Sequence, residues 1–474
     1  MPPSGRDAPT LRRRRLLEAS ASAGIIGLAG CLGDNGDDTT DVDPGDDGEE
    51  PDPDAWPDLS GHEVHLLTSE ATQPFQELWD SLAVDFETAT GARVNIEYAG
   101  IGGGYRERII ELQQAGMPPE LAQSGVDEVS TWAPQGIIGD LTPAMEYFEE
   151  EWGEFPESRT VVHDGGHRVV PLHYNLNMYH YRDDIFDVGA RTDPFETDEL
   201  LDLIAENEGT DGMGGSWYPT QNEYCCKVYA HAHALRFGGQ MMDSNNGEFE
   251  IVVDNEYIDE WTRMVEFRQD LADFGTTDTT GDCGTYSEQL ANGLVYAQFY
   301  FGARPKQNSV AQEQPFAGDV RSLAEPVPST GETGPTMGLF QGLTTFEGAD
   351  NEAANEFVKF MLQPEYLIDY YMATPIHNAP PIPEIVESDA FQSGIEATLT
   401  DEWVESDYMN HLDFQGDVIP GPMESGELNP NYWDVFTSDG LWHIMFEALE
   451  EGTDAQTAVE EGADILRERL DELQ

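Results

Sequence analysis

Basic side chains are scarce in this sequence. Its 474 residues contain 22 lysines and arginines against 93 aspartates and glutamates, which gives a formal net charge of −71. Nucleic-acid binding needs a basic surface that displaces counterions from the phosphates. No basic cluster occurs beyond the arginine block at residues 12–15. The composition therefore argues against nucleic acid as a partner.

The acidic excess also makes a prediction about the solvent. In dilute salt such a charge repels itself and destabilises the compact state. At about 1 M salt the Debye length falls to about 3 Å, and most of this repulsion is screened. The composition resembles that of a haloarchaeal protein, and we expect the chain to be halophilic.

Cysteine is also rare, with four residues in the whole chain. Adjacent cysteines seldom bond to each other, so either Cys225 or Cys226 could form a disulfide with Cys283 in an oxidising exterior. A metal site built from this pair with His231 and His233 is disfavoured, because residues two apart on a helix point to different faces. No Cys-x-x-Cys spacing supports zinc. We expect no metal and no cofactor.

No apolar run is long enough to span a bilayer, which takes about 20 residues. A short one, residues 19–29, follows the arginine block and ends at Cys31. This layout is typical of an export signal. The paired arginines resemble a twin-arginine signal, and Leu-Ala-Gly-Cys resembles a lipoprotein box whose cysteine is acylated. We predict a signal peptide over residues 1–30 and a lipid on Cys31; a secretory signal with an incidental cysteine is the alternative.

A spacer follows the predicted lipid site. Residues 33–58 consist mainly of Asp, Glu, Gly, Pro and Thr and offer almost nothing to bury. Such a segment cannot offset its ordering entropy. We predict a disordered acidic tether over residues 31–59, which places the rest of the chain outside the cell, at the outer face of the membrane.

The chain after residue 62 has an α/β pattern. Residues 63–68 and 93–98 have the apolar pattern of short strands, and a helix from about residue 74 to Gly91 has apolar side chains at helical spacing. This alternation predicts a largely parallel sheet. The glycine-rich loop after the second strand lacks the third glycine of a dinucleotide fingerprint, because Tyr105 occupies that position. About 415 ordered residues suit two or three domains.

Four segments carry a pattern that extends along the chain. They are Pro171–Phe186, Asn292–Gly302, Pro326–Met361 and the C-terminal region from Pro430. In this order they resemble the extracellular solute-binding proteins of ABC sugar importers, the family 1 type that includes maltose-binding protein. The second segment departs from the family, because Ala303 and Arg304 replace the residues that lead to a tryptophan.

The resemblance implies a type II periplasmic-binding-protein-like fold with two α/β lobes and a ligand cleft between them. Lobe 1 would hold residues 60–172 and 336–390, and lobe 2 residues 176–332 and 395–474. The chain would cross near Tyr174 and again near Pro335. Closure of such lobes about a hinge is how these proteins enclose a ligand.

Candidate ligand contacts follow from the same resemblance, because a sugar needs aromatic rings and short polar side chains in the cleft. They are Ser69, Glu70, Tyr105, Gln123, Ser124, Asp127, Trp132, Asn175, Trp217, Tyr218, Tyr300, Phe301, Tyr432 and Trp433. Trp132 has helix packing as an equal alternative. Trp79, Trp261 and Trp442 lie on apolar helical stripes, and we assign them to the core.

The expected function is capture of a sugar, an oligosaccharide or a derivative, for delivery to the permease of an ABC importer by a monomeric protein. A polyamine or other cation is the alternative ligand, since carboxylates and aromatic rings suit it. An extracellular carbohydrate-active enzyme is a further alternative, although no serine elbow, zinc motif or phosphate loop occurs.

Overall fold

A computed structural model describes residues 56–99, 103–189, 191–245, 247–278, 281, 283–399 and 418–474. These residues belong to one unit that extends to the C-terminus. The predicted signal peptide, Cys31 and most of the predicted tether lie outside the described residues. Among the described helices, none combines the length and the apolar character needed to cross a membrane.

The first strand–helix–strand unit forms as the sequence predicts. Strand β1 (Glu63–Thr68) and strand β2 (Arg93–Tyr98) pair in parallel, and helix α1 (Gln73–Thr90) connects them. The apolar stripe of α1 is buried, and Gly91 ends the helix in the left-handed region with φ 76°. A single apolar face is the reason that local periodicity locates this helix so well.

The main sheet has the strand order β11-β6-β13-β3-β1-β2, with β12 also paired to β6 and β14 to β13. Its other strands are β3 (Leu121–Gly125), β6 (Val170–Arg182), β11 (Ala297–Phe301), β12 (Val320–Ala324), β13 (Thr336–Thr344) and β14 (Val418–Ile419). The expectation of a largely parallel sheet is correct for β2, β1 and β3. It is wrong for β13, β6, β11 and β12, which pair antiparallel. Helix α1 connects β1 to β2 and helix α2 (Gly103–Gln114) leads from β2 to β3, as expected for the parallel part of the sheet.

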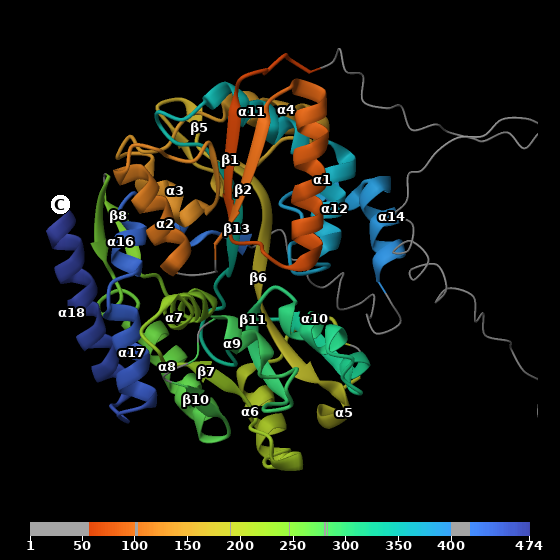
Figure 1. Cartoon of the computed structure of the whole chain (residues 1–474). Helices are drawn as coiled ribbons and strands as arrows, with labels where there is room; N and C mark the ends of the chain where they lie inside the picture. The colour runs from red at the N-terminus through yellow and green to blue at the C-terminus, as the bar shows by residue number, and fades with distance from the viewer. Residues whose placement is uncertain are drawn as a thin grey trace, which may run out of the picture. The chain divides into compact units, whose positions relative to one another are not determined.

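Two hydrophobic cores lie on either side of this sheet's centre. The first core contains β1, β3 and the buried faces of α1, α4 (Thr142–Trp152), α11 (Asn351–Met361) and α12 (Pro364–Ala373). The second core contains β11, β12 and the buried faces of α7 (Tyr224–Arg236), α8 (Ile258–Asp273), α17 (Gly440–Leu449) and α18 (Ala455–Leu473). In Figure 1 the elements of the first core lie in the upper half of the view and those of the second core lie below them. The long strand β6 runs from one group to the other.

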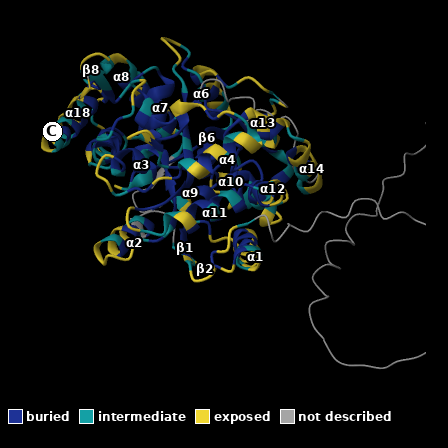
Figure 2. Ribbon diagram, turned by 90° about the horizontal axis from the view of Figure 1, so that it is seen from above, coloured by how far each residue is buried: buried dark blue, intermediate teal, exposed yellow. Residues whose placement is uncertain are grey.

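Strand β6 belongs to both cores. Leu172, Tyr174 and Leu176 are buried in the first core, whereas Tyr179 and Tyr181 are buried in the second. Buried positions fill the interior, and exposed positions lie on the outward faces of the surrounding helices (Figure 2). Helix α11 covers residues 351–361, and the C-terminal helix α18 buries an apolar stripe that includes Val459, Leu466 and Leu470.

The remaining elements are shorter and surround the two cores. The helices are α2 (Gly103–Gln114), α3 (Val126–Trp132), α5 (Asp183–Phe186), α6 (Thr197–Glu206), α9 (Cys283–Glu288), α10 (Arg304–Ala311), α13 (Pro383–Glu387), α14 (Asp389–Thr398) and α16 (Tyr432–Phe436). The strands are β4 (Val162–His163), β5 (Gly166–His167), β7 (Trp217–Pro219), β8 (Met242–Asn245), β9 (Glu248–Ile251) and β10 (Thr276–Asp278).

A glycine sets the closest approach of the two central strands. The register of β13 against β6 shifts between Gln341 and Gly342. A β-carbon at Gly342 would collide with the carbonyl oxygen of Val170 and lie 2.6 Å from the Cα of Pro171. Backbone atoms cannot move aside as a flexible side chain can, so this position requires glycine.

We predict that Gly342→Ala destabilises the protein by about 1–3 kcal/mol, the usual cost of overpacking. Gly318→Ala is the matched control, because nothing lies within 4 Å of the added β-carbon there. Denaturant unfolding at molar salt measures both variants. Equal stability of the two variants would contradict the role assigned to the close strand contact.

Candidate functional site

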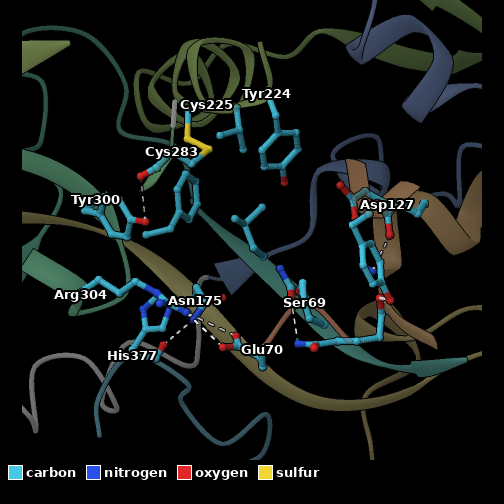
Figure 3. Close-up of a pocket in the computed structure, with 18 of the residues that line it drawn as sticks. Ser69, Glu70, Asp127, Asn175, Tyr224, Cys225, Cys283, Tyr300, Arg304 and His377 are labelled. Atoms are coloured by element: carbon cyan, nitrogen blue, oxygen red, sulfur yellow. Dashed lines mark hydrogen bonds and ion pairs between the residues drawn. A yellow bond between two sulfur atoms is a disulfide. The ribbon is translucent and has the colours of Figure 1, made fainter. Parts of the chain in front are cut away.

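A cavity lies where the two cores meet. It has a volume of about 140 Å³, several times the space that one water needs. Its walls come from the ends of β1 and β3, from β6 and β13, and from α2, α3, α7, α9 and α10. Figure 3 shows side chains from these elements pointing into one shared space. Concave sites with aromatic rings and a few polar groups are where proteins bind small molecules.

An arginine bridges one end of the cavity. Gly302, with φ 70°, turns the chain from β11 into α10, and Arg304 is the first residue of that helix. Its Nη2 lies 3.2 Å from Oε2 of Glu70, which follows β1. Its Nε donates to Nε2 of His377 over 2.7 Å. The side chain of Arg304 thus links α10, which packs beside the second core, to Glu70 and His377, which lie beside the first core.

A second arginine bridges the other end of the cavity. Arg106, on α2, donates from Nε to Oε1 of Glu128 in the first turn of α3. Its guanidinium lies 3.7 Å from the ring centroid of Trp433 and 5.1 Å from that of Tyr224. Both rings belong to helices of the second core. Stacking of this kind adds attraction at an otherwise polar contact.

Asp127 is the third carboxylate of the cavity and differs from the other two. Glu70 and Glu128 each have an arginine partner, whereas Asp127 forms no ion pair within the described part of the chain. Burial raises the pKa of Asp127 to about 7, the charge of Glu128 adds to the rise, and Arg106 opposes it. The cavity therefore holds three carboxylates against two guanidinium groups.

A disulfide forms part of the cavity wall. Cys225, near the start of α7, is bonded to Cys283, the first residue of α9, and Cys226 is a buried free thiol. The structure thus selects one of the two pairings that the sequence left open. The hydroxyl of Tyr300 donates to the carbonyl of Cys283 over 3.4 Å, which connects β11 to the start of α9 (Figure 3). Glu223 lies near both sulfurs, but these are bonded to each other and are not free to bind a metal.

Polar groups on the first-core side are fixed by hydrogen bonds. Asn175 on β6 donates from Nδ2 to the carbonyl of His377 and to Oδ1 of Asn378. Gln123 on β3 donates to Oε1 of Gln341 on β13 over 3.4 Å. Such neighbours hold a side chain in one orientation, and a pre-organised site loses less freedom when a ligand binds.

Eight of the fourteen predicted contacts line this cavity. They are Ser69, Glu70, Tyr105, Gln123, Asp127, Asn175, Tyr300 and Phe301. Their segments are distant in sequence, and the fold brings them together. The hydroxyl of Tyr105 already donates to the carbonyls of Leu67 and Gln123, so the ring rather than the hydroxyl is available to a ligand.

Six predicted contacts do not line the cavity, and three of these are tryptophans that pack against other side chains of the protein. Trp217 is buried with its ring centroid 4.6 Å from that of Tyr286. Trp132 lies 6.4 Å from Phe346 between ring centroids. Trp433 does not line the cavity itself but stacks on Arg106, which does.

The last three of the six are buried polar or aromatic residues outside the cavity lining: Ser124, Tyr218 and Tyr432. The hydroxyl of Tyr218 donates to the carbonyl of Cys226, and that of Tyr432 lies 3.0 Å from Nδ1 of His231. The other nitrogen of His231 contacts Glu424 at 2.6 Å, so this histidine belongs to a buried network. A ligand role for these six residues stays a prediction.

Several residues that line the cavity were not among the predicted contacts. They include Arg106, Glu128, Tyr224, Tyr229, Arg304, Gln341 and His377. One signal was present: Arg304 stands where the sequence departs from the family pattern. His377 and Gln341 carried no local signal.

Comparison with known proteins now identifies the family. The family model described as bacterial extracellular solute-binding protein matches residues 81–398, which is more than half of the chain. The chain belongs to this family. No curated protein sequence matches the solute-binding protein described here.

Solved structures share the fold of this solute-binding protein at low identity. Maltose-bound MalE3 of T. maritima has a TM-score of 0.68 and 17% identity, covering 85% of this chain and 98% of its own. The GacH receptor of Streptomyces glaucescens has a TM-score of 0.67 and 16% identity, covering 87% and 99%. A solute-binding protein of Agrobacterium radiobacter in complex with ribitol has a TM-score of 0.64 and 16% identity, covering 87% and 99%. These likenesses confirm the predicted two-lobed α/β fold.

The raised pKa of Asp127 predicts a pH dependence of stability. Its folded pKa of about 7 lies above the 3.8 of an ordinary aspartate, so the native state binds the extra proton. This contribution is present at low pH and is lost as the pH rises through about 7. Asp127→Asn should therefore lose less stability than the wild type between pH 5 and 8.

Denaturant unfolding at pH 5, 6, 7 and 8 measures the difference. The exposed Asp80→Asn is the control and should follow the wild type. Parallel stability curves for wild type and Asp127→Asn would show that Asp127 titrates normally.

Proposed function

We propose that this protein is a lipid-anchored, extracellular substrate-binding protein that captures a sugar, an oligosaccharide or a derivative, and delivers it to the permease of an ABC importer. In this proposal a twin-arginine signal exports the chain, Cys31 carries the lipid, and residues 31–59 form the tether. The protein acts as a monomer without catalysis, and its acidic surface is adapted to molar salt.

The observation that carries the proposal is the makeup of the cavity between the two cores. Aromatic rings of Tyr224, Tyr229 and Tyr300 lie on the second-core side, and Asn175, Gln123 and Ser69 lie on the opposite side. Rings can stack on the C–H faces of a sugar, while amides and hydroxyls hydrogen-bond its hydroxyl groups. Proteins with this fold have been solved in complex with maltose, acarbose and ribitol, which supports the same class of ligand.

The charge balance also supports a neutral ligand. Arg304 and Arg106 compensate Glu70 and Glu128, so only Asp127 remains without a counter-charge among the described lining residues. A polyamine carries several positive charges and would need several uncompensated carboxylates. A singly charged cation paired with Asp127 is the second candidate, and this one carboxylate is the observation that favours it.

We further propose that the two cores close about the ligand as lobes. The predicted lobe 1, residues 60–172 and 336–390, and lobe 2, residues 176–332 and 395–474, would hinge where the chain crosses near Tyr174 and Pro335. The contacts of Arg304 and Arg106 across the cavity are the ones that such a motion would make and break.

The sugar proposal predicts a rise in melting temperature with one member of a saccharide panel at molar salt. A ligand at 100 times its dissociation constant adds about 2.7 kcal/mol to the free energy of unfolding. For a chain of this size, this raises the melting temperature by about 3 °C. Differential scanning fluorimetry measures it. No response to any saccharide, together with a shift from another class of solute, would overturn the ligand assignment, and steady hydrolysis of a sugar would indicate an enzyme.

Asp127→Asn separates the two candidate ligands. A cation would lose its one uncompensated carboxylate and bind at least about 100-fold more weakly. A neutral sugar would lose one hydrogen-bond acceptor, and its affinity would fall about tenfold or less. Tryptophan-fluorescence titration measures both, with Asp80→Asn as the control. A loss of more than 100-fold for a neutral sugar would contradict the neutral-ligand assignment.

A further inference from the structure

A second, much smaller cavity lies away from the ligand site, between α8 and β7. It is lined by Ser216, Trp217 and Tyr218 on the strand side and by Arg268 and Leu271 on the helix side. Its volume of about 10 Å³ is close to the least that can hold one water. The space therefore suits a single water or a monatomic ion and excludes larger molecules.

Arg268 is the notable lining residue, because its charge is buried without a counter-charge. The side chain is 2% exposed. Its Nε and Nη1 are buried and donate no hydrogen bond, and it forms no ion pair in the described part of the chain. An arginine stays protonated even in such surroundings. An uncompensated buried charge is among the most unfavourable features that a protein interior can contain.

The surrounding groups compensate this charge only in part. The ring centroids of Tyr218 and Phe299 lie 4.0 and 4.7 Å from the guanidinium carbon. Aromatic rings attract a cation, but they do not replace acceptors for N–H groups that have none. Glu325 interacts electrostatically with Arg268, but its Oε1 already lies 4.0 Å from Nε of Arg236, and burial raises the pKa of Glu325, which disfavours its charged form.

We propose that this cavity is a binding site for one small inorganic anion of the halide type, held by Arg268. The anion supplies the missing negative charge and accepts hydrogen bonds from Nε and Nη1. Charge favours the anion over a water, and size favours a monatomic ion over phosphate or sulfate. The site is separate from the ligand cavity, so it does not depend on the function proposed above.

Thermal unfolding of the full chain tests the site with chloride as the probe. Sodium chloride replaces sodium gluconate stepwise at constant ionic strength, which keeps the screening of the acidic surface unchanged. The melting temperature should rise about 1–2 °C for each tenfold increase in chloride above the dissociation constant. Arg268→Met should abolish this dependence.

Arg93→Met is the matched control, because Arg93 is exposed and paired with Glu63 at the surface. It should keep the chloride dependence of the wild type. The proposal fails if the wild type responds equally to chloride and gluconate, or if Arg268→Met retains the response.

Crystals of the wild type grown or soaked in bromide provide a readout that does not depend on the folding of any variant. Anomalous scattering should show a bromide in the cavity within hydrogen-bonding distance of the Arg268 guanidinium. A site without anomalous signal, occupied by water or left empty, would overturn the proposal.

Discussion

The structure depends on one shared strand. Because β6 is continuous through both hydrophobic cores, neither core can repack without the other, and β13 on one side and β11 on the other are aligned by pairing to it. Asn175 lies on β6 close to the point where the strand passes from one core to the other. The cavity is placed at this point by backbone pairing, and its lining side chains follow from that placement.

Charge is the second constraint on the site. In a chain with 22 basic residues and a net charge of −71, two arginines are placed at the cavity, each against a glutamate. Pairing of this kind has a small net effect on stability, because the desolvation of both charges offsets their attraction. Its consequence is for recognition: the cavity presents rings, amides and a single unpaired carboxylate rather than a strongly negative surface.

Local elements could be predicted from the sequence, whereas contacts between distant segments could not. The bounds of β1 and β2 and the extent of α1 follow from periodicity and neighbouring turns, which are local properties. Ser69, Glu70 and Asn175 were found because a family pattern places strand ends at the cleft. The antiparallel half of the sheet was missed, because strand direction depends on how the chain passes between the cores.

The positions of aromatic residues were also hard to predict from the sequence, because they too depend on contacts between distant segments. Trp217 and Tyr300 are both buried aromatic residues of short strands, β7 and β11, yet only Tyr300 lines the cavity. The choice between Cys225 and Cys226 was equally out of reach, since adjacent residues on a helix differ only in the direction they face. In both cases the deciding information is tertiary: Trp217 packs on Tyr286 of α9, and the disulfide from Cys225 joins α7 to the same helix.

The account rests on a solute held between the two cores by ring faces and uncharged polar groups. The most direct test is a crystal structure, grown at molar salt, with the solute that stabilises the protein. We predict that the solute is a sugar, with a ring stacked on Tyr224 or Tyr300 and hydroxyl groups bonded to Asn175 and Asp127. Density for the solute at any other place on the molecule would contradict the account.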